Sequence, residues 1–108
     1  MKTIGMIGGL SWHSTVEYYR LINQQVQERL GGMSSAKIVL FSLNFEELRG
    51  APSRDKKIAL LEGAVAGLKR AGADFFVVCA NTTHSHFSHF VRPLELPLLH
   101  IAEVVIEE

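Results

Sequence analysis

The chain has 108 residues, of which 47% are hydrophobic, so it suits one globular domain with a single core and excludes general disorder. Lysine plus arginine equals aspartate plus glutamate at 11 each, which gives a formal net charge of zero. Because nucleic acids and anionic membranes attract basic proteins, this balance argues against both as partners.

Strands and helices alternate along the predicted chain. The apolar run Thr3–Ile7, closed by Gly8 and Gly9, predicts a first strand. A helix should follow, because apolar residues recur at steps of three and four along one face. These residues are Val16, Tyr19, Ile22, Val26 and Leu30.

The ends of this helix and the next elements have local signals. Ser14 and Glu17 match the S-x-x-E capping box, and Gly31-Gly32 provides a stop. Lys37–Phe41 predicts a second strand. Asn44–Ser53 contains several residues that break regular structure and is predicted to be a loop.

The second half of the chain continues the alternation. A second helix should bury Ile58, Leu61, Val65 and Leu68 and end near Gly72. The elements predicted after it are a strand at Asp74–Val78, a short helix at Thr83–Phe90, a strand at Leu96–Ile101 and the start of a helix at Ala102–Glu108.

This order predicts an α/β fold with a parallel four-stranded sheet and helices on both faces. The whole chain, residues 1–108, forms one domain in this interpretation. Because the last predicted helix has only begun at Glu108, we expect the chain to be truncated.

Polar segments follow three of the predicted strands, at the edge where open parallel sheets bind ligands. They are Gly8–Ser11, Ser42–Asn44 and Cys79–His84. The first presents N–H groups at a helix N-terminus, which is a general anion cradle. It has neither the G-x-G-x-x-G spacing nor the lysine of a phosphate-binding loop. A tight turn without a ligand is an equally good interpretation.

The third segment combines a thiol, an amide and hydroxyl groups where a strand meets a helix N-terminus, a position that stabilises negative charge. An isolated cysteine beside an apolar strand is nevertheless more often a small core residue. His84, His86 and His89 have no neighbouring carboxylate or second cysteine, so we expect no metal site. We expect Trp12 to pack against the edge of the sheet.

Two segments resemble the aspartate/glutamate racemase family. The opening KTIGMIGGLSWHSTVEYYRLIN is similar to the strand, glycine turn and Ser/Thr-rich helix start of that family. RAGADFFVVCANTTH is similar to its AGAD-strand-C-N-T-x-H segment. The Ser-Trp-x-Ser-Thr start resembles the broad-specificity bacterial amino-acid racemases. Both motifs occur in order, and the resemblance extends along essentially the whole chain.

The resemblance implies a cofactor-independent enzyme that needs neither pyridoxal phosphate nor metal and forms a homodimer. Its active site would lie between two similar α/β domains, of which this chain is the N-terminal one. One acid/base group from each domain, usually a cysteine, would face opposite sides of the substrate α-carbon. One group removes the α-proton and the other protonates the opposite face, which interconverts enantiomers of aspartate, glutamate or a related amino acid.

The register around Cys79 favours an alternative. In the family the acid/base residue directly precedes the asparagine, and here that residue is Ala80, with Cys79 one position earlier. Successive strand side chains point to opposite faces, so we expect Cys79, the one catalytic candidate, to be buried unless a bulge re-aims it. The alternatives are a small-acid binding protein, a one-base isomerase, lyase or decarboxylase, and a structural domain with a vestigial site.

The resemblance also assigns substrate-binding positions. Leu10 and Ser11, through their backbone, and Ala80, Asn81 and Thr82 would contact an amino acid or dicarboxylic acid. The 108 residues alone should be inactive, because the second acid/base group belongs to the other domain. The single cysteine, the lack of a membrane-length apolar run and the lack of a secretory signal predict a cytoplasmic protein.

Overall fold

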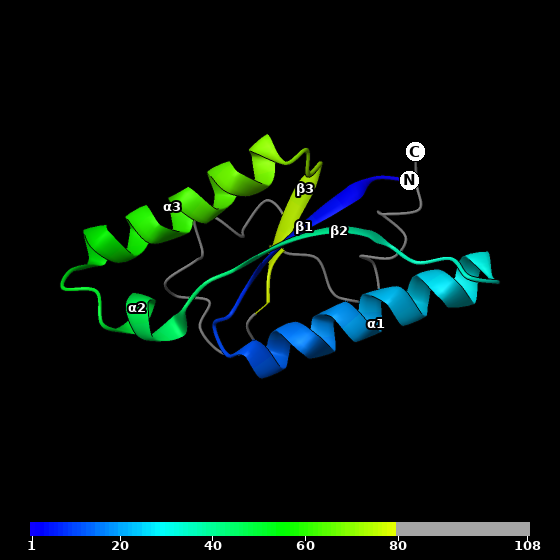
Figure 1. Cartoon of the computed structure of the whole chain (residues 1–108), viewed down its shortest axis with the longest axis horizontal. Coiled ribbons are helices and arrows are strands. Elements are labelled where there is room, and N and C mark those ends of the chain that lie inside the picture. Colours follow the sequence, from blue (N-terminus) through cyan, green and yellow to red (C-terminus); the bar gives the residue numbers. More distant parts are fainter. Residues whose placement is uncertain (80–108) are drawn as a thin grey trace.

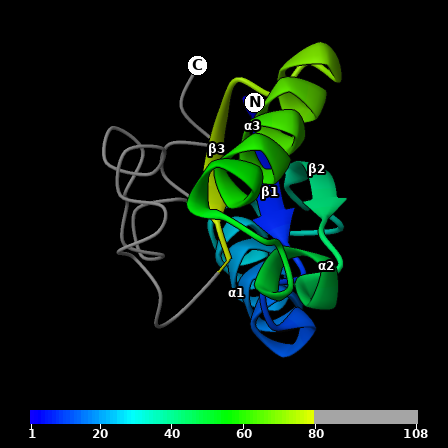
Figure 2. The same ribbon diagram turned by 90° about the vertical axis from the view of Figure 1, so that its left-hand side faces the viewer.

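The computed structural model describes residues 1–79 of the chain. Its elements in chain order are β1 (Thr3–Gly8), α1 (Trp12–Leu30), β2 (Lys37–Ser42), α2 (Phe45–Arg49), α3 (Arg54–Arg70) and β3 (Phe75–Val78). The three strands are parallel and lie in the order β2-β1-β3 (Figure 1). Helices α1 and α3 cover opposite faces of this sheet (Figure 2).

The predicted α/β class, with a parallel sheet covered on both faces, is confirmed. Three of the four predicted strands lie within one or two residues of their expected bounds. The predicted fourth strand, Leu96–Ile101, and the helices predicted at residues 83–90 and 102–108 lie outside the described residues.

Strand β1 lies at the centre of the sheet and contributes to both cores. Ile4 and Met6 are fully buried among the residues that face α1, whereas Ile7 is buried among those that face α3. This alternation follows from the two-residue period of a strand. Gly5 allows α3 to pack closely, because a Cβ atom there would lie 3.0 Å from a methyl group of Leu68.

The predicted inward face of α1 is partly wrong. Ile22 and Val26 are fully buried, but Val16 and Tyr19 are each 53% exposed, and Leu30 is also exposed. The helix is turned so that position 15 faces the sheet, where its threonine side chain is buried. This polar residue faces inward because its hydroxyl group has a partner in the loop before the helix.

The predicted capping box of α1 is also wrong. The helix begins at Trp12 with Ser11 as its N-cap, so Ser14 lies inside the first turn. Glu17 pairs with Arg20 on the helix surface, at 3.0 Å, instead of capping the N-terminus. The predicted stop is confirmed, because Gly31 ends the helix with a φ of 76° and donates its N–H to the carbonyl oxygen of Gln27.

The segment predicted as a loop after β2 contains the short helix α2. The side chain of Asn44 caps it by accepting a hydrogen bond from the N–H of Glu46, and Leu48 is its buried anchor. Helix α3 then begins after Ser53, whose hydroxyl group accepts from the N–H of Lys56. Leu61 and Leu68 are buried as predicted, together with Ala64, while Ile58 and Val65 are half-buried.

Candidate active site

The ends of the three strands meet at one edge of the sheet. The N–H of Leu43, just after β2, donates to the carbonyl oxygen of Gly8 at 2.8 Å, and the N–H of Cys79 donates to that of Ile7 at 2.9 Å. The start of α1 and the short helix α2 lie at the same end (Figure 1). Two of the three predicted segments, those after β1 and β2, are thus in contact, and the third begins beside them.

The loop between β1 and α1 has a fixed shape. Gly9 has a φ of 85°, and its N–H donates to the hydroxyl oxygen of Thr15 at 2.9 Å. A Cβ atom on Gly9 would lie 1.9 Å from the carbonyl oxygen of Leu43. The backbone can approach this closely only at glycine, so Leu43 and Thr15 clamp the loop from two sides.

Ser11 carries backbone strain at the start of α1. Its φ of 145° makes it the one residue other than glycine with a positive φ in the described part of the chain. Its hydroxyl group is exposed and makes no capping hydrogen bond. A serine in this conformation costs of order 1–3 kcal/mol, and such strain clusters at ligand sites.

Leu10 has a different role from its neighbour. Its side chain is buried in the core beneath α3, so only its backbone is placed to contact a ligand. This placement agrees with the predicted use of backbone groups at Leu10 and Ser11. Their contact with a substrate remains a prediction.

Trp12 does not pack against the sheet edge, which corrects the expectation from sequence. It is 64% exposed, and its ring stacks on that of His13 with 3.8 Å between the ring centroids. The first turn of α1 therefore presents two aromatic rings at the same end of the sheet as the loop.

Cys79 is fully buried, as expected from its register. It lies in the core beneath α1 with Met6, Ile22 and Val77. Burial in this apolar cluster raises the pKa of its thiol to about 12, because a thiolate there would lose its hydration. The next three predicted site residues, at positions 80–82 (Ala80, Asn81 and Thr82), lie outside the described residues.

The burial of Cys79 predicts a stability that falls at alkaline pH. The folded chain keeps the thiol proton up to a pKa of about 12, against an ordinary value of 9.0. The stabilisation that comes from the protonated thiol is therefore complete below the ordinary pKa. It is lost as the pH rises through the pKa of the folded chain, and the free energy of unfolding falls by up to about 1.4 kcal/mol per pH unit. In urea unfolding between about pH 8 and pH 11, the free energy of unfolding should fall less steeply with pH for Cys79→Ala than for the wild-type chain. Parallel declines would contradict the burial of the thiol.

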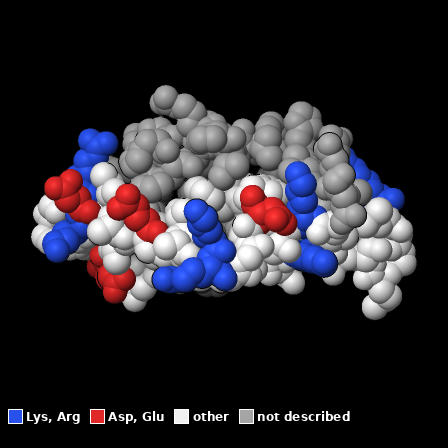
Figure 3. All heavy atoms as spheres, turned by 90° about the horizontal axis from the view of Figure 1, so that it is seen from above, with Lys and Arg blue, Asp and Glu red and all other residues white. Residues whose placement is uncertain are grey.

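Some of the surface charges of residues 1–79 form ion pairs. Arg49 contacts Glu46 within α2, much as Arg20 contacts Glu17 within α1. Figure 3 shows acidic and basic side chains interspersed over one face of the molecule. Over the same residues no three His, Cys, Asp or Glu side chains group as metal ligands, and no helix has the length and apolar character needed to cross a membrane.

Sequence reasoning missed Thr15 and Leu43, the two residues that clamp the loop. Leu43 acts through its backbone, and no side-chain pattern reports such a role. Thr15 is polar, so it does not belong to the apolar row from which the inward face of α1 was predicted.

Comparisons with known proteins agree on one family. The family model for Asp/Glu/hydantoin racemases matches residues 7–108. A crystal structure from Yersinia pestis, assigned as an Asp/Glu racemase, is 46% identical with a TM-score of 0.76 and matches 95% of this chain and 46% of its own. A crystal structure of an aspartate racemase homologue from Pyrococcus horikoshii is 32% identical with a TM-score of 0.77, over 90% of this chain and 43% of its own.

Proposed function

This chain belongs to the Asp/Glu/hydantoin racemase family, and from that premise we propose that it forms one side of an active site that exchanges the α-proton of an amino acid. The proposed reaction is the interconversion of enantiomers of aspartate, glutamate or a related acid in the cytoplasm, without a cofactor. The chain spans less than half the length of the two similar crystal structures. The proposal therefore concerns a longer protein that carries it.

The strained turn at Ser11 is the observation that carries this proposal. The turn places the first N–H groups of α1 at the carboxyl edge of the sheet, where a carboxylate is stabilised by hydrogen bonds and by the helix dipole. The clamp on Gly9 by Leu43 and Thr15 keeps these groups in place before a substrate arrives.

Such preorganised donors suit proton abstraction from an α-carbon. When the proton leaves, negative charge spreads onto the substrate carboxylate, and donors already aimed at it lower the barrier. In our proposal Asn81 and Thr82 add donors from the loop after β3. Each such donor is worth roughly 1–3 kcal/mol toward a charged acceptor.

Cys79 supports a second candidate function. Burial raises the pKa of its thiol to about 12, so the thiol stays protonated at neutral pH and makes a poor general base. The methyl group of Ala80 cannot carry a proton either. A protein that binds a small acid, or a one-base isomerase, lyase or decarboxylase that uses a group from the other domain, needs neither residue to react.

Proton exchange in deuterium oxide tests these functions. A longer protein that carries this chain is incubated separately with the L- and D-forms of aspartate and glutamate. A racemase exchanges the α-proton of both enantiomers, a one-base enzyme that of one, and a binding protein that of neither. We expect exchange with both, which requires a second acid/base group other than Cys79 and Ala80.

Two controls accompany this experiment. Cys79→Ala should leave the exchange rate within about twofold, because a buried neutral thiol takes no part. The 108-residue chain alone should give no racemisation above buffer, since its single thiol cannot serve both faces of one carbon. Exchange by the chain that is lost in Cys79→Ala would overturn our account of the thiol.

A further inference from the structure

A hollow of about 400 Å³ lies between α2 and the first two turns of α3, two helices that are neighbours in Figure 1. Small or apolar residues form its floor, among them Ala51, Pro52 and Ala59. Leu60 also lines the hollow and packs against the core beneath α3. The volume lies within the range of sites that bind small molecules.

Hydrogen bonds and a buried side chain fix the walls of this hollow. The N–H of Gly50 donates to the carbonyl oxygen of Glu46 at 2.9 Å, and the N–H of Ala51 donates to that of Leu48 at 3.2 Å. The hydroxyl group of Ser53 caps α3, and the buried side chain of Leu48 holds α2 on the core. A site that is already formed loses less entropy when a ligand binds.

Two opposite charges line the hollow. Glu47 lies on α2 and Lys56 lies on α3, and both residues are exposed. Within residues 1–79 neither side chain forms an ion pair or a hydrogen bond. The neighbouring Glu46, in contrast, pairs with Arg49. A carboxylate and an ammonium group are therefore both available to a ligand in the hollow.

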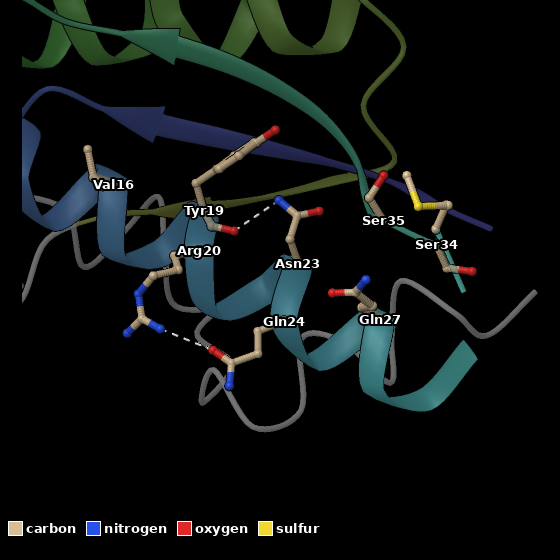
Figure 4. Close-up of a pocket in the computed structure, with 9 residues that line it drawn as sticks. Val16, Tyr19, Arg20, Asn23, Gln24, Gln27, Ser34 and Ser35 are labelled. Atoms are coloured by element: carbon tan, nitrogen blue, oxygen red, sulfur yellow. Dashed lines mark hydrogen bonds between the residues drawn. The ribbon is translucent and has the colours of Figure 1, made fainter. Parts of the chain in front are cut away.

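The larger groove beside α1 lacks this arrangement. It has a volume of about 570 Å³ and is lined by exposed Tyr19 and Met33 and by amide side chains. Figure 4 shows that its polar groups bond to one another, since Asn23 donates to the carbonyl oxygen of Tyr19 and Arg20 donates to Gln24. No carboxylate is among the described residues that line it. This groove thus offers no pair of opposite charges.

We propose that the hollow between α2 and α3 binds a free amino acid with an apolar side chain, at a site separate from the candidate active site. Lys56 pairs with the carboxylate of the amino acid and Glu47 with its ammonium group, while the apolar side chain covers Pro52 and Ala59. A zwitterion fits because it presents both charges on one small molecule. A ligand with a single charge leaves either Glu47 or Lys56 without a partner.

NMR titration of the isotope-labelled 108-residue chain with L-leucine tests this site. The amide signals of Gly50, Ala51 and Ala59 should shift and saturate, with a Kd on the order of 1–10 mM because both charges are exposed to water. L-leucinamide lacks the carboxylate and N-acetyl-L-leucine lacks the ammonium group, so each should bind at least about threefold more weakly. Equal affinity for all three ligands, no saturable shift, or shifts confined to residues 9–11 would overturn the proposal.

Charge variants test the two contacts separately. Glu47→Gln and Lys56→Met change exposed side chains, so the fold should be retained, and each should weaken the binding of L-leucine about three- to fivefold. Lys69→Met, in the last turn of α3, is the matched control and should leave Kd unchanged. Wild-type affinity in both Glu47→Gln and Lys56→Met would show that these charges do not bind the ligand.

Exchange of the two charges gives a further check. Glu47→Lys alone and Lys56→Glu alone each leave two like charges at the hollow, so both should bind L-leucine more weakly than the wild-type chain. Because a zwitterion can bind in the opposite orientation, the double variant should bind L-leucine more tightly than either single variant. A double variant whose Kd is the sum of two independent losses would contradict recognition of a zwitterion.

Discussion

Gly9→Ala is expected to cost the chain about 3–5 kcal/mol of its free energy of unfolding, which is much of what a small domain has. Two causes add. A φ of 85° is unfavourable for alanine, and the new Cβ atom would lie 1.9 Å from the carbonyl oxygen of Leu43 and 2.8 Å from its nitrogen. These atoms belong to the backbone next to β2, so relief requires β2 to move away from β1.

Urea unfolding followed by circular dichroism measures this loss, and Gly63→Ala is the matched control. Gly63 lies inside α3, and no atom lies within 4 Å of the position of its added Cβ. Alanine is favoured over glycine inside a helix by roughly 0.5–1 kcal/mol, so this variant should be more stable than the wild-type chain. Two variants of equal stability would show that the clamp on the loop is not as tight as described.

Ile22→Ala should destabilise the chain by about 2–5 kcal/mol, whereas Val16→Ala on the same helix should change stability by less than about 0.5 kcal/mol. Ile22 is fully buried against β1 and β3, so its truncation leaves a cavity beneath α1. The side chain of Val16 is 53% exposed, and alanine has the higher helix propensity.

The two variants should be compared by chemical denaturation at the same protein concentration. A loss of stability in Val16→Ala similar to that in Ile22→Ala would mean that α1 packs on the sheet with the face expected from the sequence. The comparison therefore tests the rotation of the helix about its own axis.

That rotation illustrates what could be predicted from the sequence. The apolar runs and glycine stops were sufficient for the three described strands and for the C-terminal ends of the two long helices, and the alternation of elements was sufficient for the parallel arrangement. They were insufficient for the face of α1, because an apolar row on a helix can face either a core or an open surface. Thr15 occupies the buried position because its hydroxyl group accepts a hydrogen bond from the N–H of Gly9. Such a tertiary contact leaves no periodic pattern in the sequence.

The five-residue helix α2 shows the same difficulty at shorter range. It is too short for a periodic pattern, and it depends on the side-chain cap by Asn44 and on the burial of Leu48. In the candidate site, the motifs were sufficient to place Ser11 at the sheet edge and to predict that Cys79 is buried. The φ of Ser11 and the role of Leu43 depend on how two distant segments pack, so they could be learned only from the structure.

The clamp on Gly9 also orders events during folding. Its two supports come from the first turn of α1 and from the residue after β2, so the loop takes its final shape only when a complete β1-α1-β2 unit has closed. A chain emerging from the ribosome would lack this shape until Leu43 had been synthesised and had docked. A molecule that bound to the loop in its final shape would therefore favour the closed crossover over its open states.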